Sequence, residues 1–209
     1  MKDLTKRKSR TYINCIIVIL AVTGTILSFT AKDGDTLSAR GFSSLKFFTV
    51  DSNIFAGIVS IAWILSERSS SRRAVTDLLK LAAASAVGVT FLTVLVFLGP
   101  LYGYENMYHK VNFFFHLVIP LLAMFEYVFF NGQSISVKQC LICPAIVIVY
   151  GIGYIINLFV NGFEKGDFYG FVNWGFGIGL VIFAVICLAA FLTGLLLTAL
   201  NRMTGRISV

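Results

Sequence analysis

Six long apolar runs dominate the pattern of hydrophobic and polar positions in this chain. Short polar segments rich in turn formers separate the runs. The runs occupy about residues 12–31, 46–66, 76–98, 111–131, 140–161 and 171–200. Each approaches or exceeds the roughly 20 residues that a helix needs to cross a hydrocarbon core, and all are too continuously apolar for barrel strands. The pattern therefore predicts an all-α, polytopic membrane protein, with six transmembrane helices forming one domain over residues 1–209.

Composition and charge support this prediction. Hydrophobic residues make up 57% of the 209 residues and charged residues 13%, which is more apolar than a soluble domain requires. The net charge of +7 does not indicate nucleic acid, because most of the basic residues lie before the first run, in the second and fourth loops and after the last run, whereas the remaining loops carry mixed charge. These residues are Lys2, Lys6, Arg7, Lys8, Arg10, Arg68, Arg72, Arg73, Lys138, Arg202 and Arg206. By the positive-inside rule, we expect both termini to be cytoplasmic in a multi-pass protein of the cell membrane, with membrane lipids as partners.

One histidine stands out, because His116 lies inside the fourth run, VNFFFHLVIPLLAMFEYVFF. A titratable ring in hydrocarbon persists mainly where it has a partner or faces water, which makes it a functional candidate. In the predicted topology the second and fourth spans both enter from the outer face. Thr49 then lies about 5 Å deep and His116 about 9 Å deep, at 1.5 Å per helical residue. Polar groups at similar depth on neighbouring spans can meet.

Other polar residues lie near the same level. Thr49, Ser52 and Asn53 share a helical face, whereas Asp51 points aside. Asn112, four positions before His116, is a further candidate. The fifth span adds Tyr154 and Asn157, and the start of the sixth span adds Asn173. Single Thr, Ser or Asn residues often only link membrane helices, but Asp51 and His116 are ionisable. Glu126 lies deeper, where snorkelling or a structural hydrogen bond would explain it equally well.

Three segments resemble the androgen-induced membrane-protein family: FFTVDSN, FFFHLVIPLLAMFEYVFF and VNGFEKGDFYGFVNWG. The resemblance extends over almost the whole chain. Vertebrate members of that family are six-span threonine hydrolases that cleave fatty acid esters of hydroxy fatty acids. The resemblance implies an intramembrane hydrolase of fatty acyl esters that needs no cofactor, with Thr49 as the nucleophile and His116 as the base.

The residue types fit that chemistry. A neutral imidazole can remove the proton of a neighbouring hydroxyl, and Asn53, Asn112 or Asn173 would supply hydrogen bonds to the oxyanion. Ser52, one turn from Thr49, is an alternative nucleophile, and Asp51 would orient His116 or hold a water.

Two other function classes stay open. A non-enzymatic lipid-binding or proton-coupled transport protein would use His116 and Asp51 as its polar pair. An acyltransferase would use the same nucleophile and base with another acceptor. A zinc or haem site is not expected, because two histidines and no thiolate cluster supply too few ligands.

Overall fold

The computed structural model describes residues 2–30, 41–66 and 70–207, so the first loop and Arg68 lie outside the described residues. The described part of the chain is helical and contains no strand. Six helical stretches are long and apolar enough to cross a membrane: Thr5–Thr30, Phe48–Leu65, Arg72–Tyr102, Val111–Phe130, Lys138–Asn161 and Phe176–Gly205. The predicted all-α, six-span architecture is confirmed.

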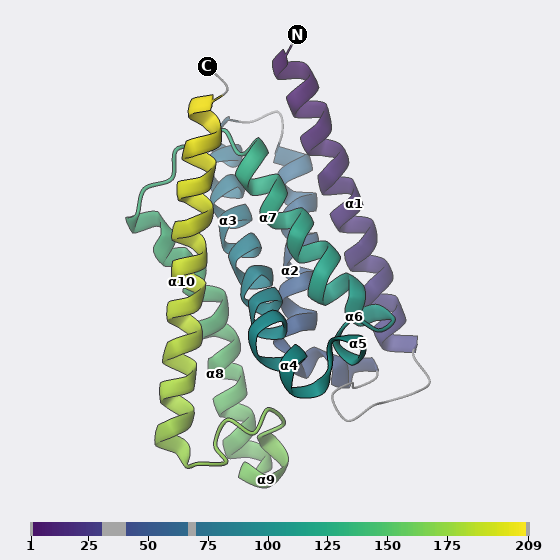
Figure 1. Ribbon diagram of the computed structural model, residues 1–209, viewed down its shortest axis with the longest axis vertical. Coiled ribbons are helices and arrows are strands. Elements are labelled where there is room, and N and C mark those ends of the chain that lie inside the picture. Colours follow the sequence, from purple (N-terminus) through teal and green to yellow (C-terminus); the bar gives the residue numbers. More distant parts are fainter. Residues whose placement is uncertain (1, 31–40, 67–69, 208–209) are drawn as a thin grey trace.

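The spans consist of long helices extended by short segments. The long helices are α1 (Lys2–Thr30), α2 (Phe48–Leu65), α3 (Ser70–Thr93), α7 (Ile119–Phe130), α8 (Cys143–Asn161) and α10 (Phe176–Ile207). The short ones are α4 (Gly99–Tyr102), α5 (Tyr104–Met107), α6 (Val111–Phe113) and α9 (Phe163–Gly166). The start of α1 and the end of α10 lie at the same end of the bundle (Figure 1). We call this the terminal end, and the opposite end, with α4, α5, α6 and α9, the far end.

The sixth span begins later than the sequence pattern predicts. The predicted span starts at residue 171, but α10 starts at Phe176. The residues before it form a turn in which Gly170 and Gly175 have φ angles of 71° and 95°. Glycine adopts such angles without the steric cost that a side chain adds. The apolar and aromatic residues of this turn extend the hydrophobic run without extending the helix.

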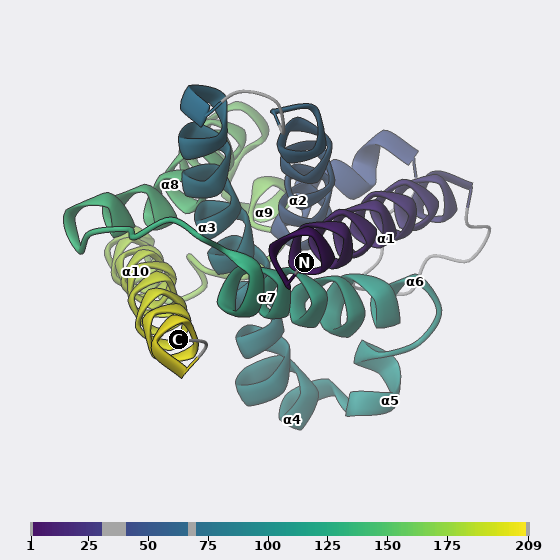
Figure 2. The same cartoon turned by 90° about the horizontal axis from the view of Figure 1, so that it is seen from above.

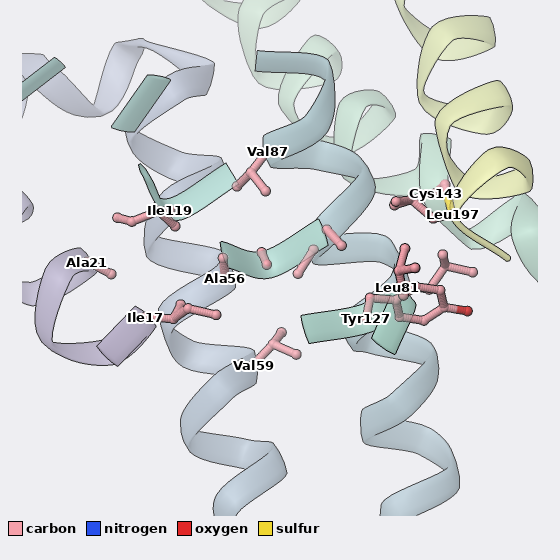
Figure 3. Packing of buried hydrophobic residues seen from close by; sticks show 14 of the residues in the cluster. Ile17, Ala21, Ala56, Val59, Leu81, Val87, Ile119, Tyr127, Cys143 and Leu197 are labelled. Atoms are coloured by element: carbon pink, nitrogen blue, oxygen red, sulfur yellow. The ribbon is translucent and has the colours of Figure 1, made fainter. Parts of the chain in front are cut away.

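Helix α3 is the centre of the bundle. It packs against α2, α7, α8 and α10, while α1 packs against α2 and α7 (Figure 2). The buried stretch of α3 is rich in alanine, including Ala83, Ala84 and Ala86, and small residues let membrane helices approach closely. Figure 3 shows the core formed between these helices, with Val87 of α3 near Ile119.

Two spans contain a π-helical turn directly before a proline-containing helix. The turns are Val94–Leu98 and Phe114–Val118, and Pro100 and Pro120 lie in the first turns of the helices that follow. Proline has no N–H to donate to the preceding turn, so the regular α-helical bonding is already interrupted at these positions. π turns are rare and occur frequently at functional sites. The second of them carries His116.

A close approach of α1 to this second turn leads to a stability prediction. A Cβ atom added at Gly24 would stand 2.4 Å from Cε1 of the buried Phe115 ring, whereas one at Gly153 of α8 would meet nothing within 4 Å. We expect Gly24→Ala to destabilise the protein by about 1–3 kcal/mol through overpacking. Gly153→Ala, the control, should be neutral or stabilising by up to about 1 kcal/mol through helix propensity. Unfolding midpoints in detergent would compare them, and equal midpoints would contradict the prediction.

Candidate functional site

His116 is held by the backbone of the short helix α5. Its side chain is 7% exposed, and Nδ1 lies 2.7 Å from the carbonyl oxygen of Met107. A carbonyl oxygen only accepts hydrogen bonds, so Nδ1 carries the proton and Nε2 is left with a lone pair. Among the described residues, Nε2 has no hydrogen-bond partner. The ring is therefore fixed in the tautomer that can accept a proton at Nε2.

A single buried amide links the backbones beside Thr49 and His116. Nδ2 of Asn53 donates to the carbonyl oxygen of Thr49 over 2.7 Å and to that of Phe115 over 3.0 Å. The second acceptor is available because the N–H of Ile119 bonds five residues back, to Phe114. In a regular α-helix this N–H would bond to Phe115 instead. The two segments that the sequence singled out are thus neighbours at the same level of the far end.

The two candidate nucleophiles have different surroundings. Ser52 is fully buried, and its hydroxyl bonds to the carbonyl of Thr49 (3.1 Å) and to the hydroxyl of Thr90 on α3 (3.2 Å). Thr49 is half-buried, and within the described chain its hydroxyl makes no hydrogen bond. No hydrogen bond joins the Thr49 and His116 side chains in this part of the chain, so their direct contact stays a prediction.

Asp51 lies on a different side of α2. It is half-buried, and its carboxylate has no hydrogen bond or ion pair with any described residue. Burial raises the pKa of Tyr169, and the negative charge of nearby Asp51 adds to that rise. The Tyr169 hydroxyl accepts a 2.9 Å hydrogen bond from the backbone N–H of Phe48. Asp51 is therefore near Tyr169 in the segment between α9 and α10, residues 167–175, which we call the far-end loop. A role of Asp51 in orienting His116 stays a prediction.

Tyr154 of α8 binds a residue that holds the far-end loop together. Its hydroxyl donates to Asp167, whose two carboxylate oxygens also accept the backbone N–H groups of Phe171 and Val172, each over 2.8 Å. Asp167 thereby folds the segment between α9 and α10. Sequence reasoning missed this residue, since it stands in an ordinary polar loop and its partners lie along the turn and on another helix.

The remaining asparagines fall into two groups. Asn157 of α8 donates to the carbonyl of Gly166 at the end of α9 over 2.9 Å, and Asn173 is exposed in the turn before α10. Asn112 is half-buried one turn before His116, and its side-chain amide makes no hydrogen bond with the described residues. Of the candidate oxyanion donors, Asn112 combines a position beside His116 with an amide that no other described residue binds.

A buried cluster of charged side chains lies in the terminal half of the bundle. Arg10 donates to Glu126 (Nε to Oε1, 2.5 Å) and to Asp77 (Nη2 to Oδ1, 2.7 Å). Lys80 lies 3.2 Å from Oε2 of Glu126 and donates to Oδ1 of Asn14 over 2.5 Å. All five side chains are buried. The cluster balances two positive against two negative charges and joins α1, α3 and α7.

The sequence indicated some members of this charged cluster but not which residues pair with one another. Arg10 was expected to belong to the basic cytoplasmic flank, but it is buried, with its guanidinium 4.3 Å from the centre of the Trp63 ring. Asp77 and Lys80 lie three residues apart, hence on one helical face, inside the predicted third span. Glu126 forms ion pairs and does not snorkel to the membrane surface. Ionisable groups within spans mark such sites, but their partners come from other helices.

Two shallow hollows lie elsewhere on the protein. One, of about 270 Å³, is an apolar groove between α1 and α2 that includes Cys15 and Ile61. The other, of about 420 Å³, lies between α2 and α3 at the terminal end and includes Ser66 and Arg72. Neither is lined by Thr49 or His116. Within the described ranges, no three His, Cys, Asp or Glu side chains come close enough together to hold a metal ion.

The fold and the site define a class of protein: a six-helix bundle with the length and apolarity of a multi-pass membrane protein, carrying a buried histidine near one end. Comparison with protein-family models, with characterised proteins and with solved structures finds no match to this chain.

Proposed function

We propose that this protein is an intramembrane hydrolase of fatty acyl esters, with Thr49 as the nucleophile and His116 as the base. The observation that carries the proposal is the Asn53 amide, which joins the backbone at Thr49 to the backbone beside His116. Nε2 of His116 and the hydroxyl of Thr49, neither of which bonds to another described residue, provide the two groups that the chemistry requires. The resemblance to the androgen-induced membrane-protein family implies the same pair.

The reaction would proceed through an acyl-enzyme. The Thr49 hydroxyl oxygen attacks the ester carbonyl carbon while Nε2 of His116 takes the hydroxyl proton. The carbon–oxygen bond of the ester then breaks, and the alcohol leaves with the proton from His116. A water molecule, deprotonated by His116, then attacks the carbonyl carbon of the acyl-threonine. The bond between this carbon and the Thr49 oxygen breaks, the fatty acid leaves, and His116 returns the proton to Thr49. Asn112, whose side-chain amide is not bonded within the described ranges, is the candidate donor to the oxyanion of each tetrahedral intermediate.

A fluorophosphonate probe on the purified full-length protein tests this proposal. The probe should modify the wild type, because an activated hydroxyl displaces fluoride and forms an oxygen–phosphorus bond. We expect His116→Ala to slow labelling by roughly 10²–10⁴-fold, the usual effect of losing a general base. The control is His109→Ala, which removes the other histidine, at an exposed position between α5 and α6. Absence of labelling in folded wild-type protein, or equal labelling of the two variants, would refute the proposal.

Proton-coupled transport is the second candidate, and the buried charged cluster favours it. Ionisable groups within membrane spans often serve proton relays, and this protein has His116 in one half of the bundle and Glu126 in the other. An apolar layer that includes Ile17, Ala56 and Ile119 lies between them along the helices. A transporter would have to open this layer and would not be modified covalently by the probe, so the labelling experiment separates the two candidates.

A further inference from the structure

We infer that Asn53 is a positioning residue, whose amide sets the placement of the Thr49 nucleophile relative to the His116 base. This inference rests on the proposed function, which it deepens. The sequence suggested another role for Asn53, as a donor to the oxyanion. Both N–H bonds of its amide nitrogen are already directed at the carbonyl oxygens of Thr49 and Phe115. No N–H of Asn53 is left for an oxyanion.

The orientation of this amide is fixed by its surroundings. Turning the Asn53 amide over would place its oxygen against two carbonyl oxygens, which is unfavourable because all three atoms are acceptors only. The side chain is fully buried, and the present Oδ1 has no partner in the described part of the structure. Both donors of the Asn53 amide thus bind backbone carbonyls, one on each of two neighbouring spans.

The link acts on the turn that carries His116. A π turn contains one residue more than an α-helical turn, which changes the direction of the following side chains by about 100° relative to a regular helix. Phe115, whose carbonyl this turn frees, immediately precedes His116. By binding that carbonyl, Asn53 favours the wide turn and ties it to α2 at Thr49. Nucleophile and base are thereby held by one rigid group.

At the other π turn, Val94–Leu98, a side chain also donates to the carbonyl that the turn leaves free. There the N–H of Gly99 bonds five residues back, to Val94, and the carbonyl of Leu95 is left without its helical donor. The hydroxyl of Tyr104 donates to it over 2.8 Å. A side-chain donor thus takes the freed carbonyl at both π turns, but only at the second does that donor belong to a neighbouring span and also bind the backbone of the proposed nucleophile.

The test compares Asn53 with another amide that joins two helices. Asn201 of α10 donates from Nδ2 to the carbonyls of Tyr127, Val128 and Asn131 at the terminal end, over 3.2, 2.9 and 3.0 Å. We would measure fluorophosphonate labelling rates of Asn53→Ala, Asn53→Asp and Asn201→Ala. Asn53→Asp keeps the shape of the side chain and donates at most one hydrogen bond, and only when protonated. It provides the test if the alanine variant does not fold.

A second readout does not depend on activity. The chain has two histidines, so protein labelled with ¹⁵N-histidine shows the ring nitrogens of His116 and His109 alone in NMR spectra. His109→Ala assigns them. In the wild type we expect the Nδ1–H tautomer for His116. The Asn53 variants should shift the His116 signals, and Asn201→Ala should not.

We expect the Asn53 variants to lose roughly 100-fold in labelling rate, the effect of misplacing a reacting group by about 1 Å, while Asn201→Ala labels like the wild type. Wild-type labelling rates in a folded Asn53 variant, or unchanged His116 signals, would overturn the inference. Equal losses in Asn53→Ala and Asn201→Ala would overturn it as well, by showing a merely structural role. If the wild type is not labelled at all, the proposed function fails, and the NMR comparison alone decides whether Asn53 positions His116.

Discussion

Replacing Thr49 by alanine is expected to abolish both covalent labelling and ester hydrolysis. The Thr49 hydroxyl is the proposed nucleophile, and alanine has no oxygen with which to form the acyl-enzyme. Ser52→Ala should keep a measurable fraction of the wild-type rate. The Ser52 hydroxyl is fully buried between the Thr49 carbonyl and Thr90, which suits packing between α2 and α3. Mass spectrometry of the labelled peptide would show the modified side chain directly.

Ser52→Ala is the matched control for this prediction, because it removes a hydroxyl from the same face of α2 one turn away. Both variants should be assayed with an ester that the wild type cleaves. Equal activity of Thr49→Ala and wild type would move the nucleophile to another residue. Loss of labelling in Ser52→Ala, with labelling retained in Thr49→Ala, would assign the role to Ser52.

Replacing Glu126 by alanine is expected to cause the largest loss of stability, about 3–5 kcal/mol. The substitution leaves the buried cations of Arg10 and Lys80 without one of their two carboxylates, and an uncompensated buried charge is far more costly than the loss of the ion pair itself. Unfolding by denaturant in detergent micelles would measure the change. Glu105→Ala is the control, since Glu105 is exposed on α5 and should have an effect within about 0.5 kcal/mol of zero.

A charge-balanced double variant tests whether the cost comes from unpaired charge. Lys80→Met together with Glu126→Gln removes one charge of each sign and leaves the Arg10–Asp77 pair, which is joined by a 2.7 Å hydrogen bond. We expect the double variant to lose less stability than Lys80→Met and Glu126→Gln lose together as single variants. The difference should be about 0.5–3 kcal/mol, the usual range for residues in one network. Additive effects, or a Glu126→Ala variant as stable as Glu105→Ala, would contradict this account.

Some features could be predicted because they depend on local sequence alone. The six spans follow from apolar length, since the membrane leaves helices as the way to satisfy the backbone of such runs. His116 could be singled out because a lone ionisable ring in an apolar run is exceptional. The shared face of Thr49, Ser52 and Asn53 follows from helix periodicity. The start of α10 was predicted five residues too early, because an aromatic turn and a helix look alike in hydrophobicity.

Other features depend on which helices become neighbours, so the tertiary structure decided them. The sequence by itself determined an all-helical, six-span chain and the polar residues that its spans carry. Only the packing of α1, α3 and α7 brought Arg10, Asp77, Lys80 and Glu126 into one buried cluster. Likewise, the contact of α2 with α3 gives Ser52 its partner Thr90, and the contact of α2 with the π turn gives Asn53 its partner Phe115. Helix periodicity fixes the face on which a side chain lies, but a hydrogen bond also needs a partner within about 3 Å, and that partner comes from a distant part of the chain.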